Sequence, residues 1–100
     1  MAAYLVLMQQ VHDSDRYLNE YVPAATPFLM KHGGEVLAAS FDAAAAEGEP
    51  PNSTVVLRFP DVAAAWGFLN DPEYRPAKEL RFSVTSQGQA VVVPEFVMPE

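Results

Sequence analysis

Two segments of the chain are apolar on both of the faces that a β-strand presents. Successive side chains of a strand point to opposite faces, and Ala3–Val11 and Ser53–Phe59 both carry apolar residues in each alternating set. A strand of this kind must be covered on both faces. We therefore expect these two segments to be the central strands of a sheet.

A helical region follows the first of these strands. Asp13 can cap its first turn, and apolar residues then recur at helical spacing as far as Lys31 or His32. Pro23 and Pro27 lie inside this region, and because each removes a backbone donor, they predict a kink or two helical pieces. Gly33-Gly34 then ends the helix, since a glycine can take the left-handed conformation that closes a last turn.

The rest of the chain supplies two more strands and a second helical region. A strand is expected over Glu35–Phe41, followed by an acidic loop over Asp42–Asn52. A short helix capped by Asp61 comes next, and then a second helix that is capped by Asp71 and has Pro72 at its first position. A turn at Ser86–Gln89 leads into a last strand over Gln89–Val93.

This order of strand, helix, strand, strand, helix and strand predicts one α+β domain over residues 1–100 with a ferredoxin-like βαββαβ fold. The four-stranded antiparallel sheet has the order four-one-three-two, and right-handed crossovers place both helical regions on one face. The other face would expose too much apolar surface for a monomer. We therefore expect a homodimer formed through the open sheet face.

Charge and composition narrow the possible partners. The net charge is −7, which disfavours nucleic acid and anionic membrane surfaces. The chain has no cysteine, and its two histidines have no metal-ligand spacing, so we expect no metal and no cofactor. No signal peptide or membrane span is evident, which predicts a cytoplasmic protein.

An ordered set of short motifs resembles a known family of small bacterial proteins. The motifs are the acidic cap at Asp13 followed by Tyr17 and Tyr21, "KHGG" at Lys31–Gly34, "EG" at Glu47–Gly48, "VVLRFPD" at Val55–Asp61, "AAW" at Ala64–Trp66, "NDPEY" at Asn70–Tyr74, and Arg81. Together they resemble the family called domain of unknown function 1330, within the dimeric α/β-barrel superfamily.

The resemblance implies a ferredoxin-like subunit that pairs through its sheet, and it implies no particular activity. Other members of the superfamily include small monooxygenases, lactone isomerases and haem-degrading enzymes. This sequence departs from the family where many members carry basic residues, because Glu35 and Ala39 stand there. Its last segment, "VVVPEF", differs as well.

His32, Tyr74 and Arg81 are the candidate catalytic residues. His32 stands at a helix end, where a positive charge is stabilising, so it is either a structural residue or a proton carrier at a pocket edge. Arg81 lies on an otherwise apolar helical face and needs a partner, which is either an internal carboxylate such as Glu73 or Asp71 or the carboxylate of a substrate.

Three further aromatic residues are candidate ligand-binding residues. Trp66, Tyr21 and Tyr17 are either core and interface side chains or the walls of an apolar pocket, and Tyr74 could supply a phenol to that pocket. We expect His32, Tyr74 and Arg81 to face one space between sheet and helices, with Trp66 as its wall.

Three functions remain open. The protein could convert a small apolar organic molecule by cofactor-independent oxygenation, isomerisation or proton transfer. It could bind such a molecule without catalysis, or it could be a structural dimer module. Whether the chain is an enzyme is left undecided by its sequence, because a fold alone does not define a function.

Overall fold

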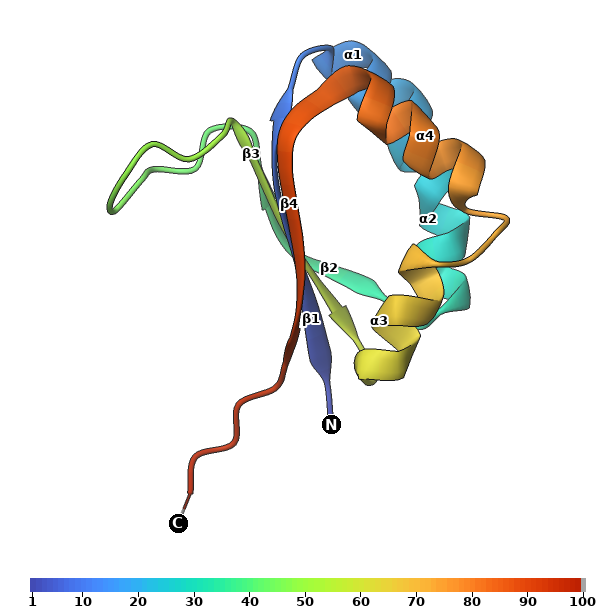
Figure 1. The fold of residues 1–100 in the computed structure, drawn as a ribbon, viewed down its shortest axis with the longest axis vertical. Helices are drawn as coiled ribbons and strands as arrows, with labels where there is room; N and C mark the ends of the chain where they lie inside the picture. The colour runs from blue at the N-terminus through green and yellow to red at the C-terminus, as the bar shows by residue number, and fades with distance from the viewer. Residues whose placement is uncertain (100) are drawn as a thin grey trace.

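A four-stranded antiparallel sheet with the order β2-β3-β1-β4 forms one layer of the structure, a computed structural model that describes residues 1–99. The strands are β1 (Ala3–Val11), β2 (Glu35–Ser40), β3 (Ser53–Phe59) and β4 (Thr85–Pro94). The helices all lie on one face of this sheet (Figure 1). The predicted strand order and ferredoxin-like topology are confirmed.

The central strands β1 and β3 are apolar on both faces, as the sequence predicts. Leu5 and Leu7 of β1 point to the helices and are buried, together with Leu57 and Phe59 of β3. The alternate residues of β1, such as Val6, point to the open face and are half-buried. The apolar side chains that are buried between the sheet and the helices therefore form the core of the subunit.

The first helical region is continuous but changes its winding. It comprises α1 (Ser14–Arg16), the π-helical segment η1 (Tyr17–Tyr21) and α2 (Val22–Lys31). The Val22 amide donates to the carbonyl of Tyr17, five residues earlier, directly before Pro23, which has no amide hydrogen. The irregularity expected from the prolines therefore lies before Pro23, in a segment whose Tyr17 and Tyr21 are both buried in the core.

The end of this region follows the sequence prediction. His32 caps α2, and Gly33 adopts a left-handed φ of 74°. A Cβ atom at position 33 would also lie 2.9 Å from the Pro60 side chain. The left-handed conformation and the close approach of Pro60 together explain why a glycine, and no residue with a side chain, occupies position 33.

Two predicted boundaries in the second half are wrong. The helix α4 runs from Arg75 to Val84 and does not begin at Asp71, because Asp71 accepts a hydrogen bond from the Glu73 amide within a turn. The segment Ser86–Gln89 is not a turn but part of β4, because α4 leads directly into that strand at Thr85. The short helix α3 (Val62–Leu69) begins as predicted, with Asp61 accepting from the Ala64 amide at 2.7 Å.

Candidate functional site

A cavity of about 330 Å³ lies between the first helical region and the strands β2 and β3. Nearly all of its lining side chains are apolar, and the rings of Tyr17 and Tyr21 form part of its wall. We call it the tyrosine cavity. Its rim contains half-exposed apolar side chains, namely Leu18, Val22, Val36 and Phe41. Because β2 is an edge strand, the cavity opens beside it.

The two tyrosines of the cavity wall come from the π-helical turn. Their ring centroids lie 5.0 Å apart, as expected for side chains four residues apart on one helical face. The rings of Tyr17 and Phe41, which follows β2, are nearly perpendicular, and their centroids lie 5.9 Å apart. A ligand with a flat apolar ring would therefore find aromatic faces and edges on one side of this cavity.

The tyrosine hydroxyl groups are held by polar partners behind the cavity wall. Gln9 Nε2 donates to the Tyr17 hydroxyl at 3.0 Å, and the hydroxyl oxygens of Tyr21 and Tyr74 lie 2.7 Å apart. Burial raises the pKa of Tyr21 far above its usual range and raises that of Tyr17 in the same direction. Both phenols therefore stay protonated near neutral pH and are poor general bases.

The candidate residues of the sequence analysis do not share one pocket. Tyr17 and Tyr21 line the tyrosine cavity, and Tyr74 lies behind its wall, stacked on Phe68. Trp66, expected to form the wall, has 51% of its surface exposed on the outside of α3.

His32 and Arg81 are likewise not among the lining residues of this cavity. Arg81 Nη1 donates to the side-chain oxygen of Gln9 at 3.0 Å, so its partner is neither Glu73 nor Asp71. Asp71 is instead hydrogen-bonded to Lys31 and His32. Arg81 and Trp66 do meet elsewhere, since both line a hollow beside β4.

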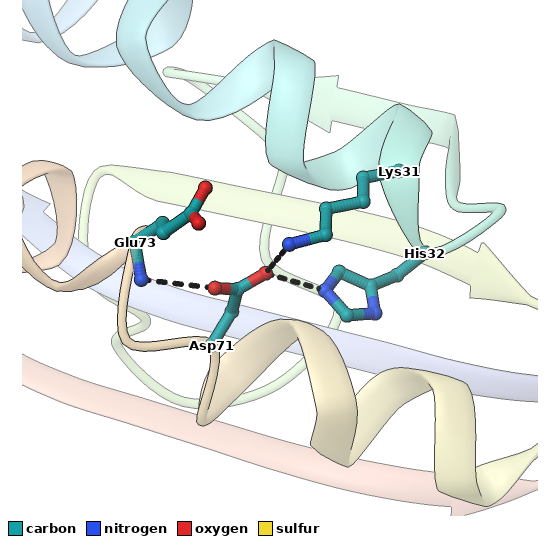
Figure 2. A network of polar contacts seen from close by, with 4 residues as sticks. All are labelled: Lys31, His32, Asp71 and Glu73. Carbon is teal, nitrogen blue, oxygen red and sulfur yellow. Dashed lines mark hydrogen bonds and ion pairs between the residues drawn. The ribbon is translucent and has the colours of Figure 1, made fainter.

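His32 belongs to a polar cluster around Asp71, which Figure 2 shows. Its Nε2 donates to Asp71 Oδ2 at 2.8 Å, and Lys31 Nζ donates to the same oxygen at 2.9 Å. The Glu73 amide donates to the other oxygen, Oδ1, at 2.9 Å. These three hydrogen bonds, led by that from His32, hold the pKa of the Asp71 carboxyl well below its usual range.

Gln9 is a buried polar residue at this site that was not predicted from the sequence. It is 1% exposed and connects Arg81 with Tyr17. The signal was present in the strand pattern, because position 9 follows Leu5 and Leu7 on the face of β1 that is otherwise apolar. A polar side chain on a buried face needs partners, and a chain of buried polar groups is what such a residue predicts.

The described residues contain no obvious metal or membrane site. Within residues 1–99, no three histidine, cysteine or acidic side chains gather as metal ligands would. None of the helices in that range is both long and apolar enough to cross a bilayer.

Comparison with known proteins places the chain in a family. The family described as "Domain of unknown function (DUF1330)" matches residues 2–96, so the chain belongs to this family. No curated protein matches the sequence. The resemblance inferred from the motifs is therefore confirmed.

Solved structures share the fold at low sequence identity. A protein of unknown function from Rhodopseudomonas palustris is 15% identical, has a TM-score of 0.78, and matches over 97% of this chain and 84% of its own. SnoaB, a cofactor-independent oxygenase from Streptomyces nogalater, is 16% identical with a TM-score of 0.64, over 99% of this chain and 98% of its own.

A third structure with the same fold is described as dimeric. A protein from Thermobifida fusca, described as dimeric and ferredoxin-like and of unknown function, is 14% identical with a TM-score of 0.56, over 95% of this chain and 92% of its own. At these identities the likeness shows the fold alone.

Proposed function

We propose that this member of the DUF1330 family binds a small, largely apolar organic molecule with an aromatic ring in the tyrosine cavity. The observation that carries the proposal is the cavity itself. Its volume of about 330 Å³ is at the lower end of the range typical of small-molecule sites, and its wall is apolar with two aromatic rings. Such a site selects a compact, flat and weakly polar ligand.

The arrangement favours binding over catalysis. Among the described residues, the lining of the cavity includes no histidine and no carboxylate. The hydroxyl groups of Tyr17 and Tyr21 already have partners, and their raised pKa values make proton abstraction unfavourable. Oxygenation on a similar fold, as in SnoaB, is an analogy of fold and supplies no base to this cavity.

The open face of the sheet supports a homodimer as the working form. Ala38, Val56, Val6 and Val91 pair in register, so they form one apolar row across all four strands. Val91 has 52% of its surface exposed, and Val93 on the same face has 44%. A second copy that stacks the same face against this row buries it by twofold symmetry.

The loop between β2 and β3 lies on the same side of the sheet as the proposed partner. It projects to the side of the sheet away from the helices (Figure 1). A subunit placed against the open face would lie beside this loop. The dimeric relative from Thermobifida fusca is consistent with this mode of assembly.

Calorimetric titration with naphthol tests the ligand proposal. Ala39→Trp places a large side chain in the cavity from the edge strand β2, and Ala24→Trp places it on the outer surface of α2 as a matched control. We expect naphthol to bind the parent protein and Ala24→Trp equally, and Ala39→Trp about tenfold more weakly or not at all. Equal binding by Ala39→Trp, or no binding by the parent, contradicts the proposal.

A further inference from the structure

Arg81 is a buried cation without an anionic partner. The residue is 5% exposed, and its one side-chain hydrogen bond goes to Gln9, which is neutral. Its Nε atom is buried and has no hydrogen-bond partner. Within residues 1–99 no carboxylate lies within ion-pairing distance of it, although the chain has 13 acidic residues. Buried charges are normally paired, so this arrangement is incomplete without an added anion.

The free part of the guanidinium has a defined shape. Nη1 is occupied by Gln9, which leaves the edge formed by Nε and Nη2. These two nitrogens carry parallel N–H groups, and this edge binds a planar carboxylate through two hydrogen bonds. This edge therefore matches a carboxylate in its geometry as well as in its charge.

Arg81 borders a hollow of about 370 Å³ between α3, α4 and β4, which we call the Arg81 hollow. Lys78 supplies a second cation to its lining, and Trp66 and Phe82 supply aromatic surface. Trp66 and Phe82 are both more than half exposed, and the Arg81 Cζ atom lies 4.8 Å from the centre of the Phe82 ring. The guanidinium group of Arg81 therefore lies against an exposed aromatic ring at the border of the hollow.

The neighbouring strand is irregular where it meets this hollow. Met8 pairs with Gln89 and Gln10 with Ser86, so Gln87 and Gly88 stand opposite the single residue Gln9. Gln87 has a φ of 53°, which is uncommon for a residue with a side chain. Bulges of this type are frequent beside binding sites, where they redirect side chains. Here the bulge faces the glutamine that positions Arg81.

We propose that the Arg81 hollow binds a small organic carboxylate with an apolar body. The carboxylate lies on the Nε and Nη2 edge of Arg81 with Lys78 nearby, and the apolar body packs against Trp66 and Phe82. Inorganic phosphate satisfies the charge but uses none of the aromatic surface, so the hollow favours the carboxylate. This site is separate from the tyrosine cavity, because Arg81 does not line that cavity, and the proposal stands without the function proposed above.

Fluorescence of Trp66 provides the readout, because it is the only tryptophan in the chain. The probes are benzoate, its neutral isostere benzamide, and inorganic phosphate. Arg81→Lys keeps the charge but loses the planar edge, and Arg81→Met removes the charge at similar length. Arg75→Met is the matched control, since Arg75 lies on the same helix, is exposed and is not part of the hollow. Thermal unfolding of each variant establishes that it is folded.

We expect benzoate to change the Trp66 emission saturably in the parent and in Arg75→Met. Affinity for benzoate should fall about tenfold or more in Arg81→Lys and Arg81→Met, and benzamide and phosphate should bind the parent more weakly than benzoate by a similar factor. The proposal is overturned if the parent shows no saturable response, if benzamide or phosphate binds as well as benzoate, or if Arg81→Lys binds benzoate like the parent. If Arg81→Met does not fold, Arg81→Lys alone decides between these outcomes.

Discussion

The imidazole Nε2 of His32 donates a hydrogen bond of 2.8 Å to the carboxylate of Asp71, 39 residues further along the chain. The contact joins the last turn of α2 to the turn between α3 and α4 (Figure 2). His32 also packs close to Gly67 of α3, where an added Cβ would lie 3.2 Å from its Nδ1. The histidine before the double glycine therefore links two helical regions.

Asp71→Asn should lower the melting temperature more than His32→Ala does. Asp71→Asn replaces a carboxylate that accepts hydrogen bonds from two side chains and one backbone amide. His32→Ala removes one of these donors and leaves the hydrogen bonds from Lys31 and the Glu73 amide to Asp71 in place. Removing a buried acceptor strands its donors, which is the costlier change. Thermal unfolding followed by circular dichroism measures both. Asp15→Asn, at an exposed position in the first turn of α1, is the control, and a smaller effect for Asp71→Asn than for His32→Ala would contradict the prediction.

The contribution of Asp71 to stability should depend on pH in acid. Its folded-state pKa is depressed below the ordinary value of 3.8, so the stabilisation is fully present above that value and is lost as the pH falls below it. Lys31 remains protonated throughout this range. The difference in unfolding free energy between the parent and Asp71→Asn should therefore shrink as the pH falls below about 4. Urea unfolding of both proteins at several pH values measures this difference in free energy. A difference that stays constant across this pH range would contradict the lowered pKa of Asp71.

The hydroxyl pair of Tyr21 and Tyr74 should appear as a coupling energy. Both residues are buried, and each single change to phenylalanine leaves the other hydroxyl without its partner. We expect each single variant to lose about 1–2 kcal/mol in unfolding free energy, and the double variant to lose less than the sum. A double-mutant cycle by urea unfolding measures the coupling, and strict additivity would show that the hydrogen bond contributes nothing.

Much of the fold was predictable because it rests on local patterns. Apolar residues on both faces of Ala3–Val11 and Ser53–Phe59 predicted the central strands, and the first glycine of Gly33-Gly34 takes the expected left-handed conformation. The errors arose where two patterns compete. Asp71 has the sequence of a helix cap, but its oxygens are used by a turn and by α2, so α4 begins at Arg75.

The site was less predictable because its partners come from distant parts of the chain. Arg81 was expected to need a partner, but spacing along one helix cannot show that Gln9, 72 residues earlier, would be that partner. Trp66 was expected inside, yet helical spacing alone does not show which side of α3 meets the sheet. Tyr17 and Tyr21 are four residues apart and so share a helical face, but their spacing alone does not show that this face borders a cavity beside β2.

Val91→Lys should convert a dimer into monomers. Val91 lies in the apolar row on the open sheet face, paired with Val6, and it is half exposed in the single subunit. In the proposed twofold dimer each subunit would bring the new lysine into an apolar interface, where burying an unpaired charge is costly. Ala24→Lys adds the same charge on the exposed surface of α2 and should leave the dimer intact. Light scattering coupled to size-exclusion chromatography at micromolar protein measures the mass. A parent with the mass of one chain would contradict the dimer itself, and a Val91→Lys protein that keeps twice that mass would show that the subunits pair through another surface.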